Sequence, residues 1–254
     1  MNAVAAIAGF TLLEARRTRA WLGALVVVAL SMALAELAAA LALTESASYR
    51  SGIYAALVRL ACVLVTMLFV AQSVARELAD RLIDLTLGRA VARTEWYCGR
   101  LGGCAAAAVL LALLATLPLI AGAPVARALA WGGSLAMELV LVAAVCLTCT
   151  VTLRQVTLAV TATSAFYLLA RAIDAMVLMS QGPTADLAQW SGRAVAAAVA
   201  LVALVLPSLD RYARADWLHD AASAPALGPL AIECAVFVLL VAAIGLVDFH
   251  RAEL

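Results

Sequence analysis

Six ionisable side chains fall inside long apolar stretches of the sequence. They are Glu36, Arg59, Glu138, Arg171, Asp174 and Glu233. A charge at the centre of a bilayer costs about 2.5–3.5 kcal/mol on insertion scales, so such residues are expected to face the protein interior or a wet cavity. Two interpretations follow. The charges form ion pairs that hold helices together, or they line a polar cavity or gate that contacts a substrate or a partner protein.

Spacing and depth suggest partners for most of these charges. Arg171 and Asp174 are three positions apart, on one face of a helix, where they can pair. Arg59 is expected to pair with Glu36 or Glu233, because all three fall in the same half of the membrane. Glu138 lies nearest the middle of its apolar stretch and has no evident partner. Glu138 is therefore the strongest candidate for a functional charge.

A second group of charges lies between two apolar stretches, in residues 76–100. Five arginines and four acids occur there. Leucines at 78, 82 and 85 have helical spacing, and Glu77 and Arg81 form a favourable i,i+4 pair. Thr94 is the expected N-cap of the next helix, with Glu95 in its first turn. The pattern predicts a short helix outside the membrane, followed by re-entry into the bilayer.

The amino-acid composition indicates the class of protein in which these charges lie. Of 254 residues, 67% are hydrophobic and 13% are charged, whereas soluble domains have roughly a quarter of their residues charged. Several apolar runs reach the length of about 20 residues that crosses a bilayer as a helix. The net charge is +1, so nothing points to a nucleic-acid partner. The chain is predicted to be an all-α polytopic membrane protein surrounded by lipids.

Six spans are expected, together with three other elements. The predicted spans are residues 20–43, 53–75, 101–121, 129–151, 156–179 and 229–248. Residues 1–19 are predicted to form an amphipathic helix in the membrane interface. Residues 181–228 contain an apolar piece, 194–207, which is short for a crossing. We expect this region to form a re-entrant or surface-lying helical hairpin.

Arginine placement predicts the orientation. One side carries Arg16, Arg17, Arg19, Arg76, Arg81, Arg89, Arg93, Arg100, Arg154 and Arg251, and the other carries Arg50, Arg127, Arg193, Arg211 and Arg214. The positive-inside rule assigns the first set to the cytoplasm. Both termini are then cytoplasmic. A full crossing by residues 194–207 would instead place the C-terminus outside.

The six cysteines do not predict a disulfide framework, because most lie within or beside apolar runs, where a thiol behaves as a small hydrophobe. Cys146 and Cys149 form a C-x-x-C inside a predicted span. They are either packing residues or a metal or redox pair. A zinc site would need further ligands, and the two histidines, His219 and His250, lie outside the spans. No metal site is expected.

The charged segment resembles the permease subunits of type-2 ABC exporters. In that family an acidic residue after the second span opens a segment of the form E-x-x-x-G-T-x-E-x-L, then P-[VI]-S-R and G-K. Glu77 and Asp84 stand at the two acidic positions, Arg93 at the final Arg, and Gly99-Arg100 at the Gly-Lys. The chain departs from the pattern elsewhere.

Those departures are Arg81-Leu82 in place of Gly-Thr, Ala90 in place of Pro, and Ala92 in place of Ser. Towards the C-terminus, the run from Leu206 to Tyr212 resembles one subgroup of the family. That subgroup includes the permease of the transporter for maturation of nitrous oxide reductase. The final residues, Asp248 to Leu254, are similar to its basic tail.

The resemblance implies a mechanical role in the bacterial cytoplasmic membrane. The segment 76–100 would be a coupling helix seated in a separate ATPase, with Glu77, Arg81, Asp84, Arg89 and Arg93 as coupling residues. The default assembly is a homodimer with two ATPase copies, which would bind ATP and Mg. The pair would export a substrate or drive a separate periplasmic partner protein.

No activity of its own is expected from the chain, because no G-x-x-x-x-G-K-[ST] loop is present in the sequence. A secondary transporter is one alternative, although the inverted repeats that would support it are not evident. An intramembrane enzyme is the other. A serine type would need a histidine within a span, and an aspartyl type would need a second intramembrane Asp beside Asp174.

Overall fold

The computed structural model describes residues 3–18, 20–41, 46–79, 92–180, 190–213 and 227–251. Within these ranges the chain forms eight α-helices and one 3-10 helix, and no strand. Six helices are long and apolar enough to cross a membrane. They are α2 (Ala20–Leu41), α3 (Ser46–Ala79), α5 (Arg93–Ile120), α6 (Val125–Leu153), α7 (Val156–Ser180) and α9 (Leu227–Arg251). The chain is thus a multi-pass membrane protein with six candidate spans.

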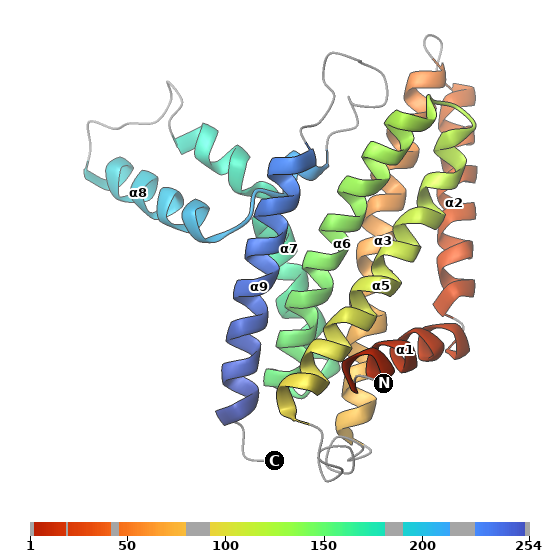
Figure 1. Ribbon diagram of the computed structural model, residues 1–254. Coiled ribbons are helices and arrows are strands. Elements are labelled where there is room, and N and C mark those ends of the chain that lie inside the picture. Colours follow the sequence, from red (N-terminus) through yellow and green to blue (C-terminus); the bar gives the residue numbers. More distant parts are fainter. Residues whose placement is uncertain are drawn as a thin grey trace.

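Helix α6 forms the centre of the bundle. It packs against α3, α5, α7 and α9 (Figure 1) and is the most buried of the six candidate spans. Helix α2 is the least buried and packs mainly on α3. Apolar side chains along the outer faces of α2 and α9 are exposed, as expected where lipid is the solvent.

The six long helices coincide with the six predicted spans, but four of them begin earlier, α6 at Val125 and α9 at Leu227 by four residues or fewer. Helix α3 begins at Ser46 rather than at 53, and α5 begins at Arg93 rather than at 101. The predicted N-cap at Thr94 is wrong. Ala92 is the N-cap of α5, and its N–H donates to the Glu95 carboxylate at 3.2 Å. The rest of the predicted coupling helix, residues 80–91, lies outside the described residues.

Helix α1 (Ala3–Arg17) lies across one end of the bundle against α5 (Figure 1). Two glycines of α5 allow the close approach. A Cβ built at Gly99 would lie 2.9 Å from the Ile7 Cβ, and one at Gly103 would lie 2.5 Å from the Thr11 Cβ. Small residues four apart are a common means of bringing two membrane helices together.

The ends of the helices sort into two groups. The C-terminal ends of α3 and α9 and the N-terminal end of α5 lie at the same end of the bundle as α1 (Figure 1). The chain returns towards that end after each pair of spans, which agrees with six crossings. The charged segment 76–100 therefore begins and ends beside α1.

Between α7 and α9 the chain forms α8 (Trp190–Val205) and the 3-10 helix η1 (Leu209–Tyr212). Helix α8 packs beside the end of α7, and the two project from the bundle (Figure 1). Its 16 residues span about 24 Å, short of a full crossing. Helix η1 is fastened to α9, because the Tyr212 hydroxyl donates to the Leu230 carbonyl at 3.0 Å. Burial raises the pKa of Tyr212, so this phenol stays a donor at ordinary pH.

Candidate functional site

The centre of the bundle holds a buried ion pair between α3 and α6. The Arg59 guanidinium donates to Oε2 of Glu138. Arg59 is 2% exposed and Glu138 is 0% exposed. Near the middle of a span, two such charges are tolerated only because each supplies the other's counter-charge.

Helix α7 adds two further groups to Glu138. The Tyr167 hydroxyl donates to Oε1 at 3.0 Å, and Nη1 of Arg171 lies 3.6 Å from the same oxygen. Arg171 also donates to the Tyr167 hydroxyl at 3.3 Å. The Glu138 carboxylate therefore joins three helices at one point. Arg171 is the most exposed member, with 37% of its side chain accessible.

The other terminal nitrogen of the Arg59 guanidinium contacts α6. Its Nη2 donates to the Ser134 hydroxyl at 3.2 Å, and its guanidinium carbon lies 5.2 Å from the centre of the Trp131 ring. Both contacts stabilise the positive charge of the guanidinium in its buried position. We refer to Arg59, Trp131, Ser134, Glu138, Tyr167 and Arg171 as the polar centre.

The polar centre differs from the predicted pairings. Glu138 was expected to have no partner, and it forms ion pairs with two arginines. Arg59 pairs with Glu138 rather than with Glu36 or Glu233, and Arg171 pairs with Glu138 rather than with Asp174. Glu36 instead lies 3.4 Å from Arg50, where both side chains are partly exposed. Among the described residues, Asp174 and Glu233 have no ion-pair partner within 4.0 Å and lie outside the polar centre.

Chemically, the polar centre is better suited to holding helices than to catalysis. Each oxygen of the Glu138 carboxylate accepts one hydrogen bond, from Arg59 at Oε2 and from Tyr167 at Oε1, and Arg171 adds a positive charge beside Oε1. Two arginines and one glutamate leave a formal surplus of one positive charge. Displacement of α7 would break the contacts of Tyr167 and Arg171 and leave the Arg59–Glu138 pair intact.

A second buried cluster fastens α1 to the bundle, and none of its contacts was predicted from the sequence. The Arg100 side chain is fully buried, and its guanidinium lies 3.0 Å from both the Glu77 and the Glu14 carboxylates. It also donates to the hydroxyls of Thr11, at 3.0 Å, and Ser73. Helices α1, α3 and α5 meet at this one side chain. We refer to these five residues as the α1 clamp.

Arg93, predicted to be a coupling residue, contacts the C-terminal end of α9. Its Nη1 donates to the carbonyl of Phe249 at 3.0 Å and to that of His250 at 3.4 Å. The Phe249 ring packs on Trp96 with centroids 5.4 Å apart. A cation at a helix C-terminus is favoured by the helix dipole. Arg81, Asp84 and Arg89 lie outside the described residues.

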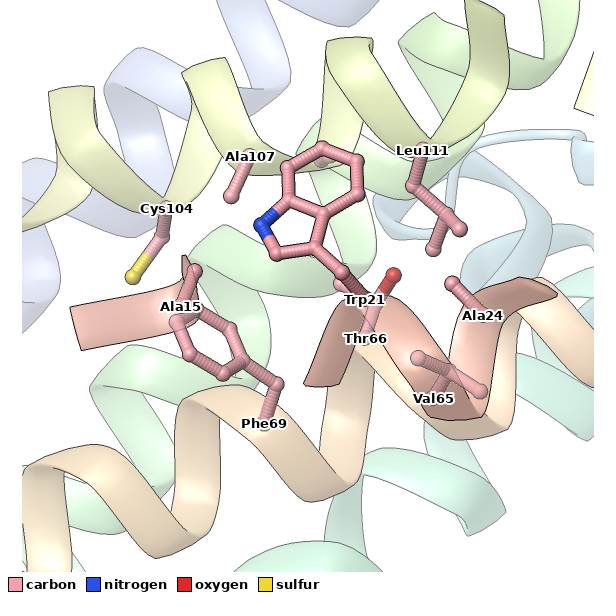
Figure 2. Close-up of a pocket in the computed structure, with 10 residues that line it drawn as sticks. Ala15, Trp21, Ala24, Val65, Thr66, Phe69, Cys104, Ala107 and Leu111 are labelled. Atoms are coloured by element: carbon pink, nitrogen blue, oxygen red, sulfur yellow. The ribbon is translucent and has the colours of Figure 1, made fainter. Parts of the chain in front are cut away.

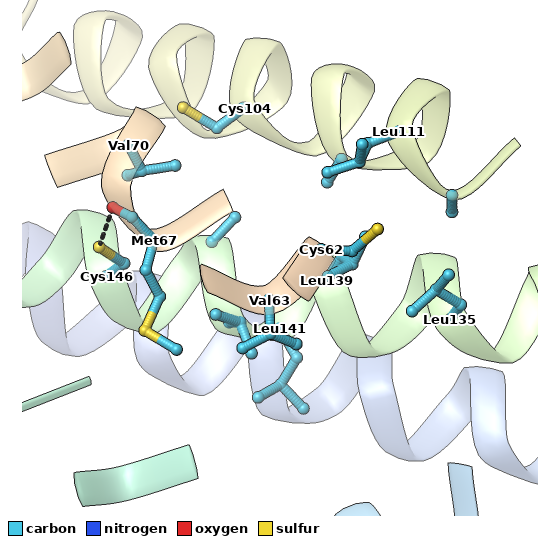
Figure 3. Close-up of a cluster of buried hydrophobic side chains, with 14 of the residues drawn as sticks. Cys62, Val63, Met67, Val70, Cys104, Leu111, Leu135, Leu139, Leu141 and Cys146 are labelled. Carbon is cyan, nitrogen blue, oxygen red and sulfur yellow. Dashed lines mark hydrogen bonds between the residues drawn. The ribbon is translucent and has the colours of Figure 1, made fainter. Parts of the chain in front are cut away.

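Four of the six cysteines are buried, Cys149 is half-buried and Cys98 is exposed. Cys62, Cys104 and Cys146 lie in the buried apolar cluster (Figure 3), and the Cys146 thiol donates to the Met67 carbonyl at 3.4 Å. All six cysteines are free thiols. Among the described residues no three His, Cys, Asp or Glu side chains are grouped to hold a metal ion.

Comparison with known proteins assigns no family. No family model matches the sequence, and no curated protein matches it. What the sequence and the fold establish is a multi-pass, all-helical membrane protein with six candidate spans.

Proposed function

We propose that the chain is the membrane-spanning permease subunit of a type-2 ABC transporter, driven by a separate ATPase. The supporting observation is how the two ends of the 80–91 connection are fastened. Glu77, at the end of α3, is held by Arg100 at 3.0 Å. Arg93, at the start of α5, is held by the carbonyls at the end of α9.

Through these attachments the 80–91 connection is linked to four of the helices. The α1 clamp links α1, α3 and α5, and Arg93 adds α9. A force applied to residues 80–91 would therefore move four helices together. Rigid-body motion of this kind is a common way to pass a conformational change across a protein. The polar centre would then be a contact that α7 makes in one state and releases in another.

The assembly that we propose follows from this role. Two copies of the chain form a homodimer in a bacterial cytoplasmic membrane, with both termini and the 80–91 connection on the cytoplasmic side. Two ATPase subunits bind ATP and Mg beneath them. The dimer exports a substrate or passes motion to a periplasmic partner.

Purification with a tagged chain tests the proposal. A soluble subunit that hydrolyses ATP should co-purify with the wild-type protein. Reversing the charges of Arg81, Asp84 and Arg89 together should abolish that ATPase activity. Arg154→Glu is the matched control, because Arg154 is exposed in the α6–α7 turn at the same end of the bundle. Intact protein that never co-purifies ATPase activity would overturn the proposal.

A secondary transporter is the second candidate, and the buried charges of the polar centre favour it. Intramembrane carboxylates and arginines line ion and proton pathways in such proteins. Proteoliposomes that contain the chain alone distinguish the two candidates. Under a pH gradient without ATP, a secondary transporter moves protons when its substrate is present, and an ABC permease subunit does not.

A further inference from the structure

An apolar groove opens at the elbow between α1 and α2. It is walled by α3 and α5 and lined chiefly by Trp21, Ala24, Phe69, Ala107 and Leu111 (Figure 2). The groove is narrow, because the centre of a water-sized sphere can occupy only about 40 Å³ of it. Its lining is almost entirely hydrocarbon, so its natural occupant in a membrane is an acyl chain.

One polar group in this groove lacks a partner. The Thr66 side chain is 4% exposed, and its hydroxyl makes no hydrogen bond with any described residue. Threonine in a helix usually bonds back to the carbonyl one turn earlier. Thr66 instead lines the groove beside Trp21 (Figure 2). A ligand with an ester carbonyl oxygen would supply the missing acceptor.

A second, open hollow shares Trp21 with the groove as a lining residue. This hollow is bounded by Leu12, Leu13, Leu22 and the exposed Arg16. No described carboxylate lies within 4.0 Å of the Arg16 guanidinium. Helix α1 lies across the end of the bundle (Figure 1), where we expect the lipid headgroups to be. Tryptophan is typical of that boundary.

We propose that the α1–α2 elbow binds one anionic phospholipid. The phosphate lies against Arg16, the ester region reaches Thr66, and one acyl chain fills the groove beside Trp21. Charge complementarity at Arg16 and the apolar groove behind it select this class of ligand over a neutral lipid. The proposal is independent of the ATPase proposal, because its test measures lipid binding by this chain alone.

Quenching of tryptophan fluorescence in nanodiscs tests the site. The probes are phosphatidylglycerol and phosphatidylcholine with brominated acyl chains, each at low fraction in unbrominated phosphatidylcholine. The chain has five tryptophans, so the signal of Trp21 is taken as the difference from a Trp21→Phe variant. Brominated phosphatidylglycerol should quench that signal at about a fivefold lower fraction, the preference expected for one arginine near an anionic headgroup.

Three variants separate this site from general lipid contact. Arg16→Gln should remove the preference for phosphatidylglycerol, whereas Arg17→Gln should keep it, because Arg17 is equally exposed but does not line the hollow. Ala107→Leu fills the groove and should weaken quenching by both lipids. A one-to-one phosphatidylglycerol adduct, retained by the wild type and lost by Arg16→Gln in native mass spectrometry, provides a second readout. Equal quenching by both lipids in the wild type, or a preference that survives Arg16→Gln, would overturn the proposal.

Discussion

Arg59 and Glu138 meet because they lie at the same depth in two helices that run in the same direction. Arg59 is thirteen residues beyond Ser46, where α3 begins, and Glu138 is thirteen residues beyond Val125, where α6 begins. At 1.5 Å per residue each lies about 20 Å along its helix. The two charges therefore meet near mid-membrane, where a counter-charge matters most.

Removing one charge of this pair should destabilise the fold. Glu138→Gln leaves the buried Arg59 uncompensated, and breaking a buried pair in this way typically costs about 3–5 kcal/mol. We expect unfolding at a lower fraction of SDS, followed by circular dichroism in mixed micelles. The double variant Arg59→Met with Glu138→Gln removes both charges and should recover much of the loss. Wild-type stability in Glu138→Gln would contradict a structural role for the pair.

Close packing of α1 on α5 should depend on Gly103 and not on its neighbour. A side chain at Gly103 would meet Thr11 at 2.5 Å, whereas nothing lies within 4 Å of a Cβ at Gly102. Gly103→Val should cost about 1–3 kcal/mol through overpacking, and Gly102→Ala should be neutral or stabilise by up to about 1 kcal/mol. Thermal unfolding of the two variants in the same detergent measures the difference. Equal losses would show that α1 does not pack at this glycine.

Loss of Arg100 should release α1. Arg100→Met leaves the Glu14 and Glu77 carboxylates close together without their shared cation. Amide hydrogen exchange across residues 3–17 should then become faster, while exchange in the middle of α6 stays slow. Arg17→Met, which removes an exposed charge from the same helix, should leave both unchanged. Slow exchange in α1 of the Arg100→Met protein would mean that the glycine contacts alone hold the helix.

The hydrogen bond between η1 and α9 should contribute modestly to stability. Tyr212→Phe removes the donor to the Leu230 carbonyl, and we expect a loss of about 1 kcal/mol. Because burial raises the pKa of Tyr212, the phenol keeps its proton and the loss should be the same at pH 6 and pH 9. Denaturation at both pH values measures it. Tyr49→Phe is the control, since that ring is 56% exposed.

Labelling of single cysteines tests the orientation of the chain in the membrane and whether α8 crosses it. In a cysteine-free background, Asp210→Cys should react with a membrane-impermeant maleimide on intact cells. Arg154→Cys should react only after the membrane is opened. Both positions are exposed in the described structure. Labelling of both, or of neither, on intact cells would contradict the proposed orientation, because η1 and the α6–α7 turn lie at opposite ends of the bundle.

The sequence was sufficient to predict the helices, because the length of an apolar run alone decides whether it can span a bilayer. It was not sufficient to predict their charge pairs. The second span was predicted to start at 53, which placed Arg59 too near one membrane surface. Glu138 was therefore not recognised as its partner. The early start of α3, at Ser46, corrects the depth. Which faces of α3, α6 and α7 meet depends on helix rotation, which is set by packing across many residues.

The α1 clamp was missed for a related reason. Glu14 and Arg100 are 86 positions apart, and only a helix folded back across the bundle brings them together. One signal for that contact was present in the sequence. Gly99 and Gly103 have the four-residue spacing of small residues that bring membrane helices together. Gly103 lies at the start of the predicted span 101–121, and Gly99 lies just before it.

The position of α1 also constrains how the protein is made. The surface on which α1 docks consists of residues from two helices. They are Ser73 and Glu77 of α3 and Gly99, Arg100 and Gly103 of α5. Helix α1 therefore has no docking surface on α3 and α5 until the chain has been translated past residue 103. The apolar side chains Phe10 and Leu13 stay exposed in the finished fold, so the lipid surface can cover them both before and after α1 docks. The amphipathic character of α1 thus serves the nascent chain before it serves the finished fold.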